Sequence, residues 1–152
     1  MRRQRNNSLL FVIISICSVL ALVIFINYLF SPSYKSKKVV AAFYTHEQKG
    51  DFARSWELLH PYMKGRWDKA QFMSDRYHVF VGHFGTDKFQ YTIKKDNKMK
   101  DWKMTEESQT LDIVYKYTVT QTYKGKYGRF SFVQEVYVAK DEEEWRILWD
   151  YN

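Results

Sequence analysis

Apolar and polar residues divide the chain into three stretches with different periodicities. Residues 9–30 form one uncharged apolar run, residues 39 to about 80 repeat with the spacing of helices, and residues 88–151 alternate with the spacing of strands. The first stretch has 22 residues, close to the ~20 that cross a bilayer core as a helix. The pattern therefore predicts a transmembrane helix followed by an α+β domain.

Two rival interpretations of the apolar run are weaker. A cleaved signal peptide has an apolar region of about 7–15 residues, and Ser31-Pro32-Ser33 is a poor cleavage site. A lipoprotein signal has a small residue before its cysteine, whereas Ile16 precedes Cys17. We therefore expect residues 9–30 to stay in the lipid bilayer as an uncleaved anchor, with Cys17 as an apolar filler.

The charges beside the anchor are nearly balanced. They are Arg2, Arg3 and Arg5 on one side, in a short basic tail over residues 1–8, and Lys35, Lys37 and Lys38 on the other, in a linker over residues 31–38. A short basic N-terminus normally stays cytoplasmic. We expect a single-pass protein of a bacterial cell membrane with the domain at 39–152 outside. The absence of cysteine after Cys17 suits an exported domain that folds without disulfides, and a cytoplasmic one equally.

Helical spacing and capping residues predict three helices, over residues 39–49, 52–60 and 69 to about 80. Gly50 suits the left-handed position after the first, and Asp51 can cap the second, which Pro61 stops. Asp68 caps the third, with Gln71 as its capping-box partner. The residues expected to close the third helix are Gly82 and Gly85.

Strand alternation in the second half predicts an antiparallel sheet. Residues 88–95 and 98–103 suggest a hairpin across Asp96-Asn97. Residues 111–119 and 130–138 suggest a longer hairpin with a Gly125-Lys126 loop, which pairs 119 with 132, 117 with 134 and 115 with 136. A turn over residues 141–144 precedes a last strand that alternates to the end of the sequence.

A family resemblance rests on several short motifs. They are Gly50-Asp51-Phe52, Trp56-Glu57-Leu58-Leu59, a capped helix with Phe72 and Tyr77, and Trp145-Arg146-Ile147. Together they resemble the nuclear-transport-factor-2-like superfamily over roughly residues 36–152, and residues 68–93 resemble the membrane-proximal domain of some penicillin-binding proteins. The resemblance implies a cone-shaped domain of three helices on a curved antiparallel sheet, which can enclose a pocket.

The sequence also departs from the penicillin-binding proteins. No transpeptidase domain follows Asn152, and no Ser-x-x-Lys acylation motif is present. We therefore expect no penicillin-binding activity.

Composition narrows the class of protein without naming a reaction. Aromatic residues make up 18% of the chain, which supplies a core and excludes disordered, collagen-like and coiled-coil classes. The 24 basic and 17 acidic residues give a net charge of +7, but they are interspersed and no nucleic-acid-binding motif occurs. We expect no nucleic-acid partner.

Enzymes of this superfamily place an acid or a histidine, often with a tyrosine, inside the cone. The residues expected to face inward from the long hairpin are Tyr115, Tyr117 and Gln134. Gln134 is polar on an otherwise apolar face, opposite Tyr117 in the predicted register. The pair can contact a ligand at the pocket mouth, form a hydrogen bond within the core, or face solvent.

Neither a metal site nor a catalytic cluster is evident. The four histidines, His46, His60, His78 and His83, have no metal-ligand spacing. His60 is expected at a helix C-terminus, where a partial positive charge suits the carbonyls. We expect no catalytic residue, metal or cofactor.

A run of lysines forms the remaining candidate contact. Lys94, Lys95, Lys98, Lys100 and Lys103 surround an exposed-looking Trp102. They suit an anionic surface such as lipid headgroups, or an ordinary solvated hairpin.

These observations favour a non-catalytic membrane protein that presents a binding or interaction domain of the bacterial envelope. Its expected partners are an envelope protein or a small apolar ligand. Two alternatives are a scaffold component of a secretion or conjugation apparatus, since the type IV secretion assembly component combines one span with this fold, and an enzyme acting on a small apolar substrate.

Overall fold

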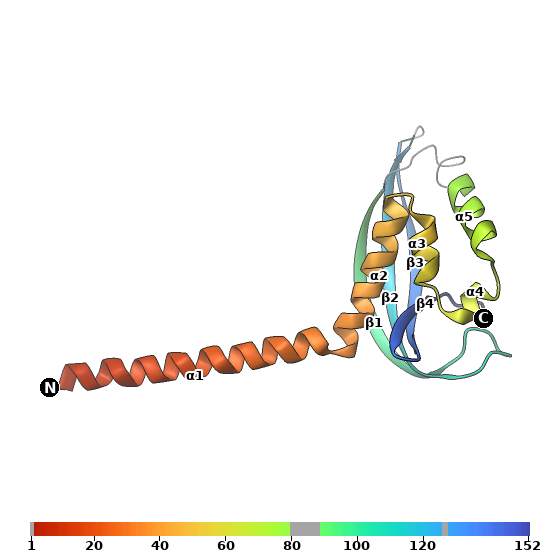
Figure 1. Ribbon diagram of the computed structural model, residues 1–152. Coiled ribbons are helices and arrows are strands. Elements are labelled where there is room, and N and C mark those ends of the chain that lie inside the picture. The colour runs from red at the N-terminus through yellow and green to blue at the C-terminus, as the bar shows by residue number, and fades with distance from the viewer. Residues whose placement is uncertain (1, 80–88, 126–127) are drawn as a thin grey trace. The chain divides into compact units, whose positions relative to one another are not determined.

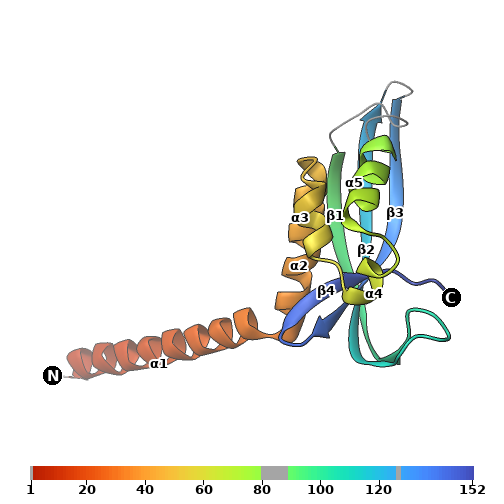
Figure 2. The ribbon, with the colours of Figure 1, turned by 45° about the vertical axis from the view of Figure 1, so that its right-hand side comes forward.

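The computed structural model describes residues 2–79, 89–125 and 128–152. The chain forms two compact units, Met1–Lys35 and Ser36–Asn152. The second unit is an α+β domain in which helices accompany an open, four-stranded antiparallel sheet (Figures 1 and 2). The predicted fold class is thus confirmed at this level, and the cone shape stays a prediction.

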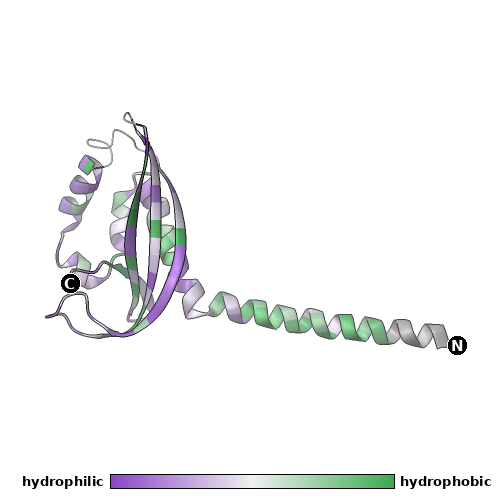
Figure 3. Cartoon of the chain, turned by 180° about the vertical axis from the view of Figure 1, so that it is seen from behind, coloured by the Kyte–Doolittle hydropathy of each residue, from purple (hydrophilic) through white to green (hydrophobic). Residues whose placement is uncertain are grey.

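Helix α1 (Arg2–Phe30) contains the predicted anchor. Its segment Leu9–Phe30 buries none of its residues inside the structure, and Figure 3 shows a nearly continuous run of apolar residues along it. A helix of this length and composition is suited to cross a membrane.

Helix α2 (Pro32–Gln48) begins directly after α1. Ser31 Oγ accepts a hydrogen bond from the Tyr34 amide at 3.2 Å, and Pro32 takes the first helical position, where its missing N–H is not needed. Residues 32–38, expected as a linker, are therefore helical. Farther along, α2 buries one face, on which Phe43 and Glu47 lie.

Two short helices replace the single helix predicted over residues 52–60. Gly50 has a φ of 70° and Asp51 caps α3 (Phe52–Glu57), as predicted. The chain then leaves the helix to pair with a strand, because the His60 amide donates to the Ile147 carbonyl at 2.9 Å. Helix α4 (Pro61–Lys64) follows, so Pro61 starts a helix rather than stopping one.

Helix α5 (Lys69–Tyr77) has the predicted cap. The Gln71 amide donates to Asp68 Oδ1 at 2.8 Å. The α-helix ends at Tyr77 and a π-helical turn continues through Val79, close to the predicted end at about residue 80, which lies outside the described residues together with the expected closing residues Gly82 and Gly85. Only Phe72 of α5 is buried, so α5 is held mainly by that side chain and by its packing on α3.

The sheet contains β1 (Phe89–Trp102), β2 (Leu111–Gly125), β3 (Gly128–Asp141) and β4 (Glu144–Leu148), in that order. The predicted hairpin across Asp96-Asn97 is wrong. β1 is one strand with a bulge between Lys95 and Lys98, and it pairs along its length with β2. Asp96 is held there because its carboxylate accepts a hydrogen bond from the Thr118 hydroxyl at 2.6 Å.

The predicted register of the long hairpin is also wrong, by two residues. Val119 pairs with Gln134 and Tyr117 with Val136, because the strands meet at Gly125 and Gly128 rather than around a Gly125-Lys126 loop. A shift of two residues keeps every side chain on its predicted face. Lys126 itself lies outside the described residues. The two-residue turn between β3 and β4 is confirmed.

The sheet is buried on both faces near the start of β2. One face packs against α2, where Tyr117 contacts Ser36. On the opposite face Trp102 stacks on Tyr137, with ring centroids 4.7 Å apart. Trp102 is therefore buried, contrary to its predicted exposure, because Tyr137 and its neighbours give it an apolar surface to cover.

Candidate binding site

The three residues predicted to line a pocket are tied into the packing between α2 and the sheet. Tyr117 is fully buried, and its hydroxyl lies 2.7 Å from Ser36 Oγ. Gln134 lies opposite Val119 rather than Tyr117, and its Oε1 accepts a hydrogen bond from the Tyr44 hydroxyl at 2.8 Å. Tyr115 is buried as well. None of the three lines either pocket described below, and their role in ligand contact stays a prediction.

A buried ion pair connects α2 with α5. Arg76 Nε lies 3.4 Å from Glu47 Oε2, and the Glu47 side chain is 1% exposed. Ser55 Oγ of α3 donates to Glu47 Oε1 at 2.5 Å. Burial raises the pKa of Glu47, while Arg76 and the Ser55 hydrogen bond act in the opposite direction. The carboxylate therefore ties three helices together inside the domain.

Two tyrosines extend this polar cluster along the inner face of the sheet. The Tyr123 hydroxyl donates to Gln121 Oε1 at 2.7 Å, in a buried bond. Burial raises the pKa of both Tyr44 and Tyr123 well above the usual range, so both remain neutral hydrogen-bond donors. The cluster is a hydrogen-bonded network that positions helices on the sheet.

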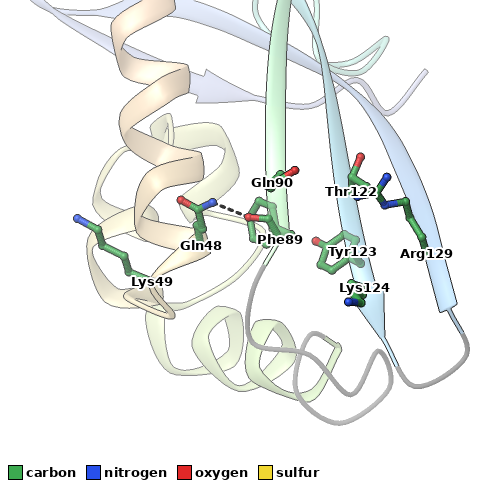
Figure 4. A pocket seen from close by; sticks show the side chains of 8 residues that line it. All are labelled: Gln48, Lys49, Phe89, Gln90, Thr122, Tyr123, Lys124 and Arg129. Carbon is green, nitrogen blue, oxygen red and sulfur yellow. Dashed lines mark hydrogen bonds between the residues drawn. The ribbon is translucent and has the colours of Figure 1, made fainter.

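Tyr123 also borders a pocket of about 490 Å³. The pocket lies where the end of α2 approaches the first residues of β1 and the β2–β3 end of the sheet (Figure 4). The rings of Phe89 and Tyr123, 5.1 Å apart between centroids, supply an apolar wall. The lining residues are Gln48, Lys49, Phe89, Gln90, Thr122, Tyr123, Lys124 and Arg129.

The end of α2 is fixed to the pocket by a side-chain bond. Gln48 Nε2 donates to the Phe89 carbonyl at 2.5 Å, which Figure 4 shows as a dashed line. Gln48 therefore joins α2 to the start of β1. The pocket volume lies in the range of about 300–1,000 Å³ that is usual for small-molecule sites.

Among the described residues that line this pocket, the charged ones are all cations: Lys49, Lys124 and Arg129. Within the part of the chain that the structure describes, none of these cations forms an ion pair. Lys124 and Arg129 are direct partners across the β2–β3 ladder, an arrangement of like charges that is unfavourable without a counter-charge.

The lysines predicted to contact an anionic surface all lie exposed on or just after β1. They are Lys94, Lys95, Lys98, Lys100 and Lys103. β1 is an edge strand, and lysines on an edge strand also hinder pairing with another chain. Contact of these lysines with an anionic surface stays a prediction.

His60 has a different place from the one predicted. It is buried and caps the start of α4, where its Nδ1 accepts a hydrogen bond from the Tyr62 amide at 3.2 Å. Burial lowers the pKa of His60, which suits this neutral acceptor role rather than a charge at a helix C-terminus. Across residues 2–79, 89–125 and 128–152 no cluster of ligand-type side chains could hold a metal ion.

A second pocket, of about 180 Å³, lies beside α5. Its lining consists of Trp67, Phe72, Asp75, Arg76, Val79 and Trp149. The Arg76 guanidinium lies 5.2 Å from the Phe72 ring centroid and 5.3 Å from that of Trp149. Because the protein's own cation covers these rings, the larger of the two pockets is the candidate for ligand binding.

The sequence analysis missed most residues of the Glu47 cluster and of the larger pocket. Glu47 could have been found, because it follows Phe43 by four residues on the apolar side of a predicted helix. Lys124 and Arg129 flank the turn of the long hairpin, but the predicted register did not place them opposite each other.

Comparison of the chain with protein-family models, with curated proteins and with solved structures found no match. The assignment of the site therefore depends on its geometry. The resemblance to the nuclear-transport-factor-2-like superfamily stays a prediction.

Proposed function

We propose that this chain is a single-pass membrane protein whose Ser36–Asn152 domain lies outside the bacterial cytoplasm and binds a small ligand without chemical conversion. The observation that carries the proposal is the pocket of about 490 Å³ at the end of the sheet, lined from α2, β1, β2 and β3. The uncharged helix at Leu9–Phe30 supports the anchor.

The site suits binding better than catalysis. The buried acid Glu47 is already engaged by Arg76 and Ser55, and the Tyr123 hydroxyl at the pocket wall is engaged by Gln121. A small ligand can instead use the exposed cations and the two aromatic rings of the lining.

Binding is tested with full-length protein in lipid nanodiscs. A Gln90→Trp variant places a large ring in the pocket lining, while Thr92→Trp, two residues along the same strand and outside the lining, is the matched control. After incubation with a small-molecule extract of bacterial cells, native mass spectrometry should find a bound compound on wild type and Thr92→Trp that is lost from Gln90→Trp. No bound compound, or equal binding to both variants, would refute the proposal.

The location is tested separately with reporters fused to Asn152. An alkaline phosphatase fusion should be active, and a green fluorescent protein fusion exported by the same route should be dark. The opposite pair of results would place the domain in the cytoplasm and overturn the proposed orientation.

A further inference from the structure

We infer that the ligand of the pocket carries a phosphate monoester group, as sugar phosphates and phosphatidic acid headgroups do. This inference rests on the proposed function, since it names the chemistry of the ligand that the same pocket takes. The argument begins from the charges of Lys49, Lys124 and Arg129 and from their positions.

Among the described residues, no acidic side chain balances the charges in the lining. Lys49, Lys124 and Arg129 are exposed, and each lies near the end of a helix or strand. No described carboxylate pairs with any of them. Elsewhere on the sheet, by contrast, Lys116 lies 2.6 Å from Glu135 and Lys140 lies 3.1 Å from Glu143. Lys116 and Lys140 thus have acidic partners, which the three pocket cations lack among the described residues. Lys98 and Lys100 on the β1 edge also have none, but they stand outside the pocket.

The two cations of the β2–β3 hairpin, Lys124 and Arg129, give the strongest indication that the ligand is an anion. Lys124 and Arg129 are direct cross-strand partners, and like charges in that position destabilise a hairpin. Lys49 follows the last residue of α2, where a positive charge also offsets the partial negative charge of the helix carbonyls. The described residues give Lys124 and Arg129 no such second role, and an anion between them would remove their mutual repulsion.

The amount of charge favours phosphate over a single carboxylate. A phosphate monoester carries a charge of about −1.5 to −2 at pH 7, which matches the two hairpin cations, whereas one carboxylate matches only one of them. The pocket of about 490 Å³ also has room for an organic group attached to the phosphate. The rings of Phe89 and Tyr123 provide an apolar wall for that group.

The test uses full-length protein in nanodiscs of phosphatidylcholine, which has no net charge, at about 0.15 M salt to limit long-range attraction. Isothermal titration measures the binding of inorganic pyrophosphate and of sn-glycerol 3-phosphate, a soluble stand-in for the phosphatidic acid headgroup. The test variant is Lys124→Ala/Arg129→Ala. The control is Lys98→Ala/Lys100→Ala, which removes the same charge from exposed positions of β1 outside the pocket.

We expect saturable binding of at least one probe. Loss of a charge-assisted hydrogen bond typically weakens binding about tenfold or more. The pocket variant should therefore lose at least tenfold in affinity, while the control stays within about twofold of wild type. Tighter binding of glycerol phosphate would indicate a lipid headgroup as the source, and tighter binding of pyrophosphate a soluble phosphate compound.

Two failures have different meanings. If neither probe binds, but an uncharged compound from the extract binds wild type and not Gln90→Trp, the phosphate inference is wrong and the proposed function stands. If no compound bound to wild type is lost from Gln90→Trp, the phosphate inference and the proposed function are both wrong. Equal weakening by the pocket and control variants would show general charge attraction, which also overturns the inference.

Discussion

The ion pair between Glu47 and Arg76 gives an asymmetric prediction for the two partners. Replacing Arg76 with Met keeps the side-chain bulk near the rings of Phe43, Phe72 and Trp149 but leaves the Glu47 carboxylate without its cation. Replacing Glu47 with Gln removes the buried charge and with it the ion pair to Arg76. We expect Arg76→Met to cost more stability at pH 8.

The size of each stability loss follows from how exposed the remaining side chain is to water. The Glu47 side chain is 1% exposed and that of Arg76 is 21% exposed, so only the arginine can keep water contact. Removing one partner of a buried pair costs about 3–5 kcal/mol when the other is left charged and dry. For Glu47→Gln, where the remaining charge stays hydrated, about 1.5–3 kcal/mol is expected, as for a lost hydrogen bond to a charged group.

The stability cost of Arg76→Met should depend on pH. Burial raises the pKa of Glu47 in the folded protein above its value in the unfolded chain. Between these two pKa values the folded state binds more protons, so stability falls as pH rises. Because Arg76 lowers the pKa of Glu47, Arg76→Met widens that interval. The cost of Arg76→Met should therefore be largest at pH 8 and shrink toward pH 4, and Glu47→Gln should abolish this dependence.

The assay is urea unfolding of the full chain in mild detergent, followed by fluorescence of the five tryptophans, all of which lie beyond residue 55. The double variant Arg76→Met/Glu47→Gln should recover stability relative to Arg76→Met at pH 8. Equal costs of the two single variants at pH 8, or a cost of Arg76→Met that does not change between pH 4 and pH 8, would refute the buried-charge reasoning.

Three further predictions concern local structure and use the same unfolding assay. Gly50→Ala should cost about 1 kcal/mol, because φ is 70° there although a Cβ would meet nothing within 4 Å; no loss would contradict the left-handed conformation. Asp68→Ala should cost about 1 kcal/mol through loss of the cap to the Gln71 amide, while Asp68→Asn should be nearly neutral, and equal losses would argue against capping. Tyr117→Phe should cost about 1–2 kcal/mol because it removes a buried hydroxyl bonded to Ser36, and an unchanged midpoint would contradict that bond.

The sequence predicted helices best where a cap defines their start. Asp51 and Asp68 were identified correctly because a capping side chain acts on amides two or three residues away. Helix ends depended on distant partners instead. Residues 58–60 leave the helix to pair with Ile147, a contact that no local pattern near Pro61 could indicate.

The strands show the same limit. Asp96-Asn97 has the composition of a turn, yet it lies within β1 because β2 is long enough to pair along that whole strand. The hairpin faces were predicted correctly while the pairs were not, because alternation specifies a face and only the turn geometry specifies the register. The pocket cations depended on that register, and so the sequence alone could not place them together.

The two edges of the sheet have a consequence for crowding at a membrane. β4 is bridged at Ile147 by Leu59, while β1 has no further strand on its outer side among the described residues and bears the exposed lysines and a bulge. Proteins anchored in one bilayer meet in two dimensions at high local concentration, where exposed edges would join copies into extended sheets. If the domain is anchored as proposed, repulsion between lysine-bearing edges would keep such copies apart, so that the domain would remain dispersed at high density with its pocket accessible.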